Sequence, residues 1–460
     1  MVAAIESHVG VVAFPFGTHA APLLAIIRRL AAASAPNTIF SFFNTSQSNH
    51  TIFTTTNTTT NGSGGDCGSE LNIKPYEVWH GVPEGHIFTR GHQEPIELFM
   101  KAAPQSLRRS IDKAVAEIGK EVTCLVTDAF FWFGGDLAHE MGVSWVPFWT
   151  AGPCALSAHL YTDLIRHQVG NGNKSLSFIQ GMSKIQIQDL PEGVVFGDLE
   201  SHFSTMLHQM GLMLPRATAI FINSFEELDK TFTNDLKSKF KKFLNVGPFN
   251  LVSPTPQPAQ DESGCLSWLD KQEVASVVYI SFGSVAVPPK EELVAIAEAL
   301  ESSGVPFIWS LKDNAKANLP KGFLEKAKTQ GKVVAWAPQK NILSHKSVGV
   351  FVSHCGWNSL LESIVGGVPM ICRPFFGDQR LNGRMVEDVW EFGIKIEGGV
   401  FTKQGMKVCL DVVLCQEKGK KMRENIQVLK EVAIEAVGIG GSSTKNFKEL
   451  LHLINSHSVA

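Results

Sequence analysis

Residues 336–379 contain the side chains of this chain that are best suited to binding a nucleotide. An apolar run at 348–352 is followed by Ser-His-Cys-Gly at 353–356 and then by a helical pattern at 357–365. This order predicts a strand, a tight turn and the N-terminus of a helix. Because free backbone N–H groups and the positive end of the helix dipole meet at such a turn, it suits a phosphate group.

Polar side chains near this turn have two interpretations each. Asn358 and Ser359 fall in the first turn of the expected helix, and Glu362 follows on the same face, where it can hold the two hydroxyls of a ribose. Ser359-x-x-Glu362 also has the form of a capping box, and Asp378 before Gln379 has the form of an N-cap. Taken together at this spacing, the residues favour a nucleotide site.

A pyrophosphate can be held by Ser284, His354, Asn358 and Ser359. Neither a Walker loop nor a cluster of acidic magnesium ligands accompanies them in the sequence. We therefore expect neutral donors and a helix dipole to stabilise the charge of a leaving group. Trp336, at the end of an expected strand, either stacks on a base or packs in the core.

A second set of candidate residues lies in the first half of the chain. His19 follows the first expected strand, and Asp128 follows another strand of the same sheet. A carboxylate beside His19 would fix the imidazole tautomer and stabilise its protonated form, which makes a general base. The structural alternatives are a solvated histidine and an aspartate that caps a helix beginning at Phe130. No G-x-S-x-G elbow is present, so a hydrolase triad is disfavoured.

Alternating strands and helices must position these residues. The expected strands are 8–14, 38–43, 123–127, 143–148 and 219–223 in the first half, and 276–281, 307–311, 333–336 and 348–352 in the second. This alternation predicts a mostly parallel sheet with helices on both faces in each half. The proline-containing stretch 250–264 is the expected linker between domains 1–249 and 265–440, and a helix within 441–460 is expected to pack back on the first domain.

Ligands of doubly wound sheets bind at the carboxyl ends of the strands. In two such domains that face one another, those ends border a shared cleft. The residues expected there are His19, Asp128, Thr150, Ser284, His354 and Asp378.

Composition excludes several classes of function. A formal net charge of −3 gives no basic surface for nucleic acid, and no run reaches the roughly 18 apolar residues of a membrane span. Glu6 and His8 interrupt the apolar N-terminus, so we expect no secretion signal and a cytoplasmic protein. Eight cysteines without a C-x-x-C pair predict reduced, buried thiols. The Thr/Asn/Gly segment 51–69 predicts a mobile surface loop.

The stretch 336–379, which begins WAPQ and contains HCGWNS, LES, GVP and DQ, closely resembles the signature of plant secondary-product UDP-sugar glycosyltransferases. In the rest of the chain, FPFGTHAAPLL, SFFNTSQSN, HGVPEG, WTAGPCALSAHLYTD, GMSK and FINSFEELD are similar to the flavonoid 3-O-glucosyltransferase branch of that family. The resemblance implies a GT-B fold of two facing, doubly wound Rossmann-like domains. It also implies a metal-independent, inverting enzyme with UDP-glucose as co-substrate, which we expect to be monomeric.

The resemblance also assigns roles to individual residues. Trp336 would stack on the uracil, Ala337 would bond it through the backbone with Gln339 nearby, and Glu362 would bind the ribose. The diphosphate contacts would be Ser284, His354, Asn358 and Ser359, and the sugar contacts Thr150, Trp357, Asp378 and Gln379. In this family a glutamine at the last position of the signature goes with glucose and a histidine with galactose.

On the acceptor side the resemblance makes His19 the base and Asp128 its partner, and it places Gln93, Phe130, His159 and Phe376 around the acceptor. The expected reaction glucosylates the 3-hydroxyl of a flavonol or anthocyanidin. Alternatives are another phenolic or terpenoid hydroxyl, a non-catalytic binder that kept the fold, and a nicotinamide-dependent epimerase. The last of these lacks its glycine fingerprint.

Overall fold

The computed structural model describes residues 6–57, 72–89, 93–252, 261 and 263–456. The chain forms two compact units. Unit 1 consists of Met1–Asn173, Glu192–Gln257 and Ile439–Ala460, and unit 2 consists of Lys174–Pro191 and Pro258–Gly438. The expected linker 250–264 lies partly outside the described residues.

Unit 1 contains a seven-stranded, fully parallel sheet in the order β3-β2-β1-β4-β5-β6-β7. Its strands are β1 (Ser7–Val12), β2 (Thr38–Asn44), β3 (Ile73–Glu77), β4 (Cys124–Asp128), β5 (Ser144–Trp149), β6 (Ile220–Ile222) and β7 (Phe243–Asn245). The strand order reverses between β1 and β4, which creates a switch point at their carboxyl ends.

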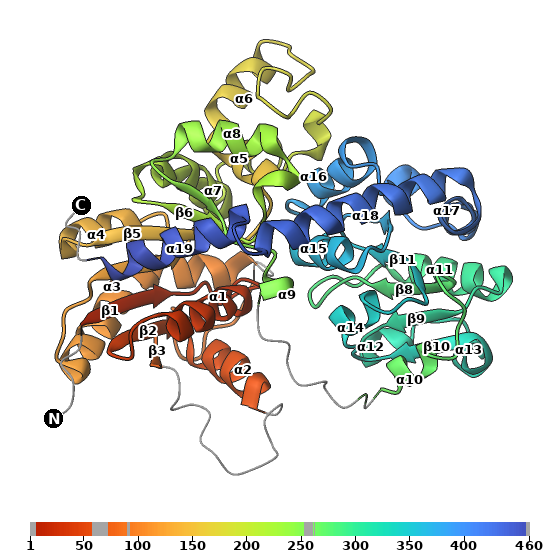
Figure 1. The fold of residues 1–460 in the computed structure, drawn as a ribbon, viewed down its shortest axis with the longest axis horizontal. Coiled ribbons are helices and arrows are strands. Elements are labelled where there is room, and N and C mark those ends of the chain that lie inside the picture. The colour runs from red at the N-terminus through yellow and green to blue at the C-terminus, as the bar shows by residue number, and fades with distance from the viewer. Residues whose placement is uncertain (1–5, 58–71, 90–92, 253–260, 262, 457–460) are drawn as a thin grey trace. The chain divides into compact units, whose positions relative to one another are not determined.

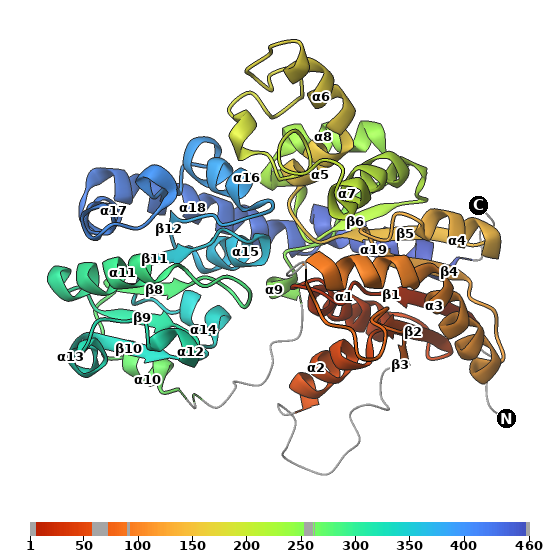
Figure 2. The ribbon, with the colours of Figure 1, turned by 180° about the vertical axis from the view of Figure 1, so that it is seen from behind.

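Helices cover both faces of this sheet. The helices of unit 1 are α1 (Ala20–Ala33), α2 (Ser46–Asn57), α3 (Glu94–Ile118), α4 (Gly134–Met141), α5 (Pro153–Leu160), α6 (Thr162–Gly170), α7 (His202–Met213), α8 (Lys230–Lys239), α9 (Phe249–Val252) and α19 (Ser442–Asn455). Apolar residues of α1 recur at helical spacing and pack in one core with Phe447, Leu450 and Ile454 of α19. Figure 1 shows α19, in blue, along that face, and Figure 2 shows α3 on the opposite face.

Unit 2 repeats the plan with a six-stranded parallel sheet in the order β10-β9-β8-β11-β12-β13. Its strands are β8 (Val277–Ser281), β9 (Phe307–Ser310), β10 (Gly331–Val334), β11 (Val348–Ser353), β12 (Met370–Cys372) and β13 (Gly393–Lys395). The switch point lies between β8 and β11. This confirms the prediction of a parallel sheet in each half of the chain.

The helices of unit 2 are α10 (Cys265–Leu269), α11 (Lys290–Ser303), α12 (Asp313–Lys316), α13 (Phe323–Gln330), α14 (Gln339–Leu343), α15 (Trp357–Gly366), α16 (Gln379–Arg384), α17 (Lys403–Cys415) and α18 (Glu417–Val437), with a π-helical turn at Met385–Val389. Helices α11 and α17 pack together, and α14 packs on α15 (Figure 2). Helix α15 begins shortly after β11 ends, as the sequence predicts.

Three expectations about local structure are wrong. Residues 51–57 are not a loop but the second half of α2, where Phe53 packs on Phe42, with ring centroids 5.6 Å apart. Tertiary packing here overrides the weak helix propensity of threonine. The remainder of the expected loop, 58–69, lies outside the described residues.

The expected strand 333–336 ends at Val334, because β10 is an edge strand whose pairing with β9 ends at Ser310. The helix expected from Phe130 begins at Gly134 instead. Turns through 128–133 precede it, and two successive glycines, Gly134 and Gly135, allow close contact with the Trp145 ring.

Candidate active site

The imidazole of His19 lies beside a buried carboxylate in unit 1. His19 directly precedes α1, Asp128 is the last residue of β4, and Nδ1 of His19 is 2.8 Å from Oδ2 of Asp128. Thr150, which follows β5, places its Oγ1 3.2 Å from the same ring nitrogen. The topology thus brings together three residues from the carboxyl ends of β1, β4 and β5, as the switch-point rule predicts.

The contact with Asp128 determines which ring nitrogen carries the proton. A carboxylate only accepts hydrogen bonds, so the neutral imidazole donates from Nδ1 and keeps its lone pair on Nε2. The Asp128 side chain is 1% exposed and that of His19 is 18% exposed. Nε2 of His19 can therefore accept a proton from a bound ligand, and the Asp128 carboxylate then stabilises the imidazolium that forms.

Aromatic rings surround His19. Phe14 and Phe130 have centroids 5.1 and 4.6 Å from the imidazole, and Trp149 connects Phe130 to His159 at 6.3 and 5.7 Å. Burial lowers the pKa of His159 to about 4, so its ring is neutral near pH 7. Of the expected acceptor residues, Phe130 and His159 thus belong to one aromatic group around His19.

The other two expected acceptor residues are exposed. Gln93 precedes α3 in unit 1, and Phe376 lies in unit 2 with an exposed fraction of 47%.

At the switch point of unit 2, the turn after β11 holds His354 between two glycines. A Cβ atom on Gly283 would lie 2.9 Å from Cε1 of His354, and one on Gly356 would lie 2.5 Å from Nε2. Burial lowers the pKa of His354 to about 4, and its Nδ1 has no hydrogen-bond partner within the described part of the chain. A neutral, half-buried imidazole whose buried Nδ1 is unused fits a site that binds a phosphate. Ser284, which follows β8 and Gly283, is exposed at the same end of the sheet.

Helix α15 begins at this turn without a side-chain cap. Its N-cap is Gly356, and the structure shows no capping hydrogen bond from a side chain, so the capping-box interpretation of Ser359 is wrong. Trp357 and Ser359 are buried and Asn358 is half-buried in the first turn. No side chain caps this helix N-terminus, where the helix dipole favours an anion.

Gln339, the first residue of α14, hydrogen-bonds to this helix. Its Nε2 donates to Oγ of Ser359 at 3.1 Å and to Oε2 of Glu362 at 2.6 Å, and its Oε1 accepts from the Tyr279 hydroxyl at 3.1 Å. Burial raises the pKa of Glu362, and the Gln339 hydrogen bond acts in the opposite direction. The carboxylate is thus held in one orientation, as a ligand for two vicinal hydroxyls requires.

Trp336 lies beyond β10 and is 67% exposed, whereas the neighbouring Ala337 is 5% exposed. The alternative that Trp336 packs in the core is therefore wrong. An exposed indole offers a face on which a planar base can stack.

Asp378 ends the loop between β12 and α16, and Gln379 is the first residue of α16. Asp378 occupies the N-cap position of α16 but makes no capping hydrogen bond; its Oδ2 accepts instead from Nδ2 of Asn382 at 2.8 Å. Asp378 thus has the predicted N-cap position, but its side chain does not cap the helix.

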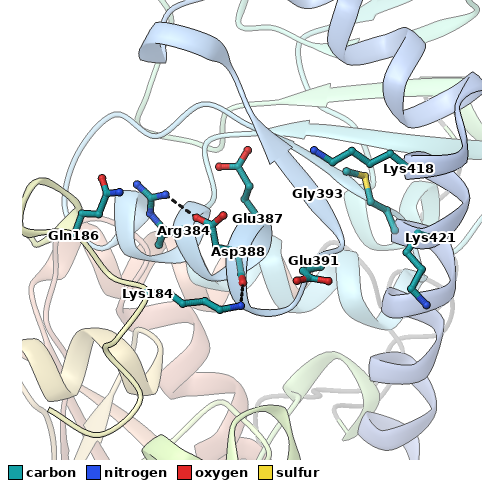
Figure 3. Close-up of a pocket in the computed structure, with 10 residues that line it drawn as sticks. Lys184, Gln186, Arg384, Glu387, Asp388, Glu391, Gly393, Lys418 and Lys421 are labelled. Carbon is teal, nitrogen blue, oxygen red and sulfur yellow. Dashed lines mark hydrogen bonds and ion pairs between the residues drawn. The ribbon is translucent and has the colours of Figure 1, made fainter. Parts of the chain in front are cut away.

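Figure 3 shows a pocket of unit 2, of about 550 Å³, lined mainly by charged side chains of both signs. Arg384 there pairs with Asp388 at 2.6 Å and with Asp189 of the segment Lys174–Pro191 at 2.7 Å, and Lys184 donates to the backbone oxygen of Asp388. These bonds hold that segment in unit 2. No residue of 336–379 lines this pocket.

Within the described residues, no three His, Cys, Asp or Glu side chains are grouped so that they could hold a metal ion. No helix in the same part of the chain is long and apolar enough to cross a membrane. Of the described cysteines, which are all free, only Cys415 is exposed; Cys67 lies outside the described residues.

Two doubly wound parallel sheets, with polar groups gathered at the switch point of each, define the GT-B class of glycosyltransferase fold. The chain belongs to the UDP-glucoronosyl and UDP-glucosyl transferase family, whose model matches residues 22–434. It is therefore a UDP-glycosyltransferase, as the resemblance of residues 336–379 predicts.

Individual relatives match over almost the full chain. The anthocyanidin 3-O-glucosyltransferase of Vitis vinifera is 59% identical, covering 97% of both chains. The flavonol 3-O-glucosyltransferase of Arabidopsis thaliana is 58% identical, covering 98% of this chain and 97% of the relative. A solved structure of a UDP-glucose:anthocyanidin 3-O-glucosyltransferase in complex with UDP is 42% identical, with a TM-score of 0.90, covering 98% of this chain and 99% of that one.

Sequence reasoning missed several residues of the site. Asn382, which bonds Asp378, could have been found from its place one helical turn later. Gly283 packs on His354 only in three dimensions, and Tyr279, which bonds Gln339, lies within a strand that the sequence predicts as plain core.

Proposed function

We propose that this enzyme transfers glucose from UDP-glucose to the 3-hydroxyl of a flavonol or anthocyanidin, with inversion at the anomeric carbon. The observation that carries the acceptor assignment is the identity of 59% and 58% to an anthocyanidin and a flavonol 3-O-glucosyltransferase over nearly the whole chain. UDP in the similar solved structure supports the donor nucleotide. Gln379 at the last position of the signature favours glucose.

In the proposed reaction, Nε2 of His19 takes the proton of the acceptor hydroxyl. The freed oxygen attacks the anomeric carbon from the face opposite UDP, and the bond from that carbon to the diphosphate oxygen breaks with its electron pair. A β-glucoside and UDP result. The geometry of His19 and Asp128 supports this step, because the carboxylate keeps the Nε2 lone pair available and then stabilises the imidazolium.

On the donor side, the negative charge that develops on UDP would meet His354, Ser284 and the N-terminus of α15. Trp336 would stack on the uracil beside Ala337, and Glu362, held by Gln339, would bind the ribose. Trp357 is proposed, with Thr150, Asp378 and Gln379, to contact the sugar.

The acceptor would meet the aromatic group around His19. Phe130 and His159 are proposed to contact the flat ring system, and Gln93 and Phe376 to contact its edges. Because aromatic rings contact both histidines, a planar phenolic fits this group better than a bulky terpenoid.

The test uses a flavonol together with the matched flavone that lacks only the 3-hydroxyl. We expect UDP and a single β-glucoside at the 3-position of the flavonol, identified by nuclear magnetic resonance, and no product from the flavone. Parallel incubation with UDP-galactose tests the sugar. Equal turnover of the flavone would overturn the 3-hydroxyl assignment, and binding of both substrates without turnover would favour the non-catalytic alternative.

A further inference from the structure

Lys312 places a positive charge next to the turn after β8 in unit 2. It follows β9 and precedes α12, and its Nζ donates to the backbone oxygen of Ser284 at 2.6 Å. Ser284 follows Gly283, where an added Cβ would lie 2.9 Å from Cε1 of His354. Because β9, β8 and β11 are neighbours in one parallel sheet, the residues that follow them share one end of it. The Lys312 ammonium thus reaches the turn that packs against the neutral imidazole of His354.

The charge of Lys312 is not neutralised by a carboxylate within the described part of the chain. Its printed partner, a backbone oxygen, is a neutral acceptor. Other cations at the strand ends of unit 2 differ in this respect. Arg373, after β12, lies 3.0 Å from Glu292, and Lys395, at the end of β13, lies 3.4 Å from Glu387. Lys312 can therefore change its hydrogen-bond partner without breaking an ion pair.

We propose that Lys312 binds the diphosphate of the donor and stabilises its negative charge as UDP leaves. In that step the bond from the anomeric carbon to the diphosphate oxygen breaks, and its electron pair stays on that oxygen. The Lys312 ammonium keeps its proton and turns from the Ser284 carbonyl to a phosphate oxygen, because an anion accepts a stronger hydrogen bond than a neutral group. This inference rests on the proposed function, which places the diphosphate at His354, Ser284 and α15.

A cation at this place favours the products of the reaction over the substrates. The terminal phosphate of free UDP loses a second proton with a pKa of about 6, as other phosphate monoesters do, whereas the same phosphate in UDP-glucose is a diester with a single charge. Lys312 should therefore interact more strongly with departing UDP than with bound UDP-glucose, and such a difference accelerates the step. The sequence predicts neutral donors and a helix dipole for the leaving group, and Lys312 adds a charge to them.

The variant Lys312→Met removes the charge and keeps a long, unbranched side chain, and Lys312→Arg keeps the charge. The matched control is Lys346→Met, because Lys346 is exposed near the amino end of β11, at the opposite edge of the same sheet. Affinities for uridine, UDP and UDP-glucose are measured by titration calorimetry at low and high salt. These measurements need no acceptor and no turnover.

We expect Lys312→Met to bind uridine as the wild type does, because uridine has no phosphate. UDP should bind about 10-fold or more weakly, as when a hydrogen bond between charged groups is lost, and UDP-glucose should lose less. Added salt should weaken UDP binding more steeply in the wild type than in Lys312→Met. Lys312→Arg should recover most of the lost affinity, and Lys346→Met should bind all three ligands like the wild type.

Equal affinity of the wild type and Lys312→Met for UDP at both salt concentrations would overturn the inference. An equal loss for uridine and UDP would also overturn it, because Lys312 would then only support the shape of the turn. A loss of the same size in Lys346→Met would show a general effect of charge instead of a contact. A wild type that binds UDP but glucosylates no flavonol would refute the proposed function and leave this inference intact.

Discussion

Nδ1 of His19 lies 2.8 Å from Oδ2 of Asp128, and the other oxygen of that carboxylate accepts from the backbone N–H of Phe130 at 2.9 Å. The carboxylate is thus fixed from two sides, and its orientation is set by the turn that precedes α4. The substitution Asp128→Asn tests whether this arrangement determines which nitrogen of His19 carries the proton.

In Asp128→Asn, the new carbonyl oxygen can still accept from Phe130, which turns the NH₂ group toward His19. The imidazole must then accept at Nδ1 and carry its proton on Nε2, where the lone pair is needed. We expect kcat to fall by about 10²- to 10⁴-fold, the usual contribution of general-base catalysis. Steady-state kinetics at saturating donor measures this loss.

The control for this variant is its affinity for UDP, which should not change, because the proposed uridine and diphosphate contacts lie in unit 2. His19→Ala should show a loss of similar size, and the double variant should lose little more, since the two residues act together. Turnover of Asp128→Asn near that of the wild type would show that the pair is only structural.

Glu362→Ala should weaken UDP by about 1.5–3 kcal/mol, the range for a hydrogen bond that involves a charged group. Gln339 holds the carboxylate at 2.6 Å, so this side chain has little freedom to turn elsewhere. The measurement compares UDP with 2′-deoxy-UDP on both proteins. The wild type should prefer UDP, and Glu362→Ala should bind the two nearly equally. An unchanged preference would mean that Glu362 does not bind the ribose.

Trp336→Ala tests whether the exposed indole stacks on the base. Because Trp336 is 67% exposed, its loss should change the free energy of unfolding by only about 0.5 kcal/mol. Affinity for UDP should nevertheless fall by about 1–3 kcal/mol, the range measured for stacking of one base on an aromatic side chain. Trp79→Ala, which removes another exposed indole, should leave UDP affinity unchanged.

The sequence predicts which residues lie at the site better than it predicts the contacts that these residues make. His19, Asp128 and Thr150 each follow a strong apolar strand, and the switch-point rule then places them at one edge of a sheet. In the same way, β11 and α15 follow from an apolar run and a helical pattern. Long, periodic elements thus determine which residues share an end of the sheet.

Contacts that depend on short or irregular segments could not be predicted. Strand β3 is mostly exposed and alternates poorly, and β7 and β12 have three residues each, too few for a pattern. Local sequence also suggests caps at Ser359 and Asp378 that do not form, because Gln339 and Asn382 bond these side chains instead. Gln339, the partner of Ser359, is a tertiary neighbour that one sequence does not reveal, whereas Asn382 lies one helical turn after Asp378.

Buried histidines should make the fold sensitive to acid. Burial lowers the pKa of His159 and of His354 to about 4, and that of His8 in the same direction. The unfolded chain binds these protons near pH 6.5, before the folded protein does. Their contribution is therefore complete above pH 6.5 and is lost as the pH falls toward the folded pKa, at up to about 1.4 kcal/mol per pH unit for each group.

Urea unfolding at pH 7, 6 and 5 measures this loss. His159→Gln removes one titrating group and should show a shallower fall in the free energy of unfolding with decreasing pH. His452→Gln, at an exposed position of α19, should keep the slope of the wild type. Equal slopes for all three proteins would mean that folding does not lower the pKa of His159.

Gly283, in the turn after β8, packs against the ring of His354 in the proposed phosphate site. It has φ of +74°, and an added Cβ would lie 2.9 Å from the His354 ring. Gly304, at the end of α11, has φ of +68° but no atom within 4 Å of an added Cβ. Alanine at either position strains the backbone by about 1–2 kcal/mol, but only at Gly283 must the imidazole also move.

Gly283→Ala and Gly304→Ala should therefore lose similar amounts of stability, whereas only Gly283→Ala should weaken UDP, by about 10-fold or more, as expected when a hydrogen bond to a charged group is lost. Thermal unfolding and UDP titration separate the two effects. Because the His354 pKa is lowered by burial, displacement of the ring toward water should also raise that pKa, which nuclear magnetic resonance titration of the imidazole can follow. If both variants bind UDP equally well, the close packing of Gly283 on His354 does not matter for the donor.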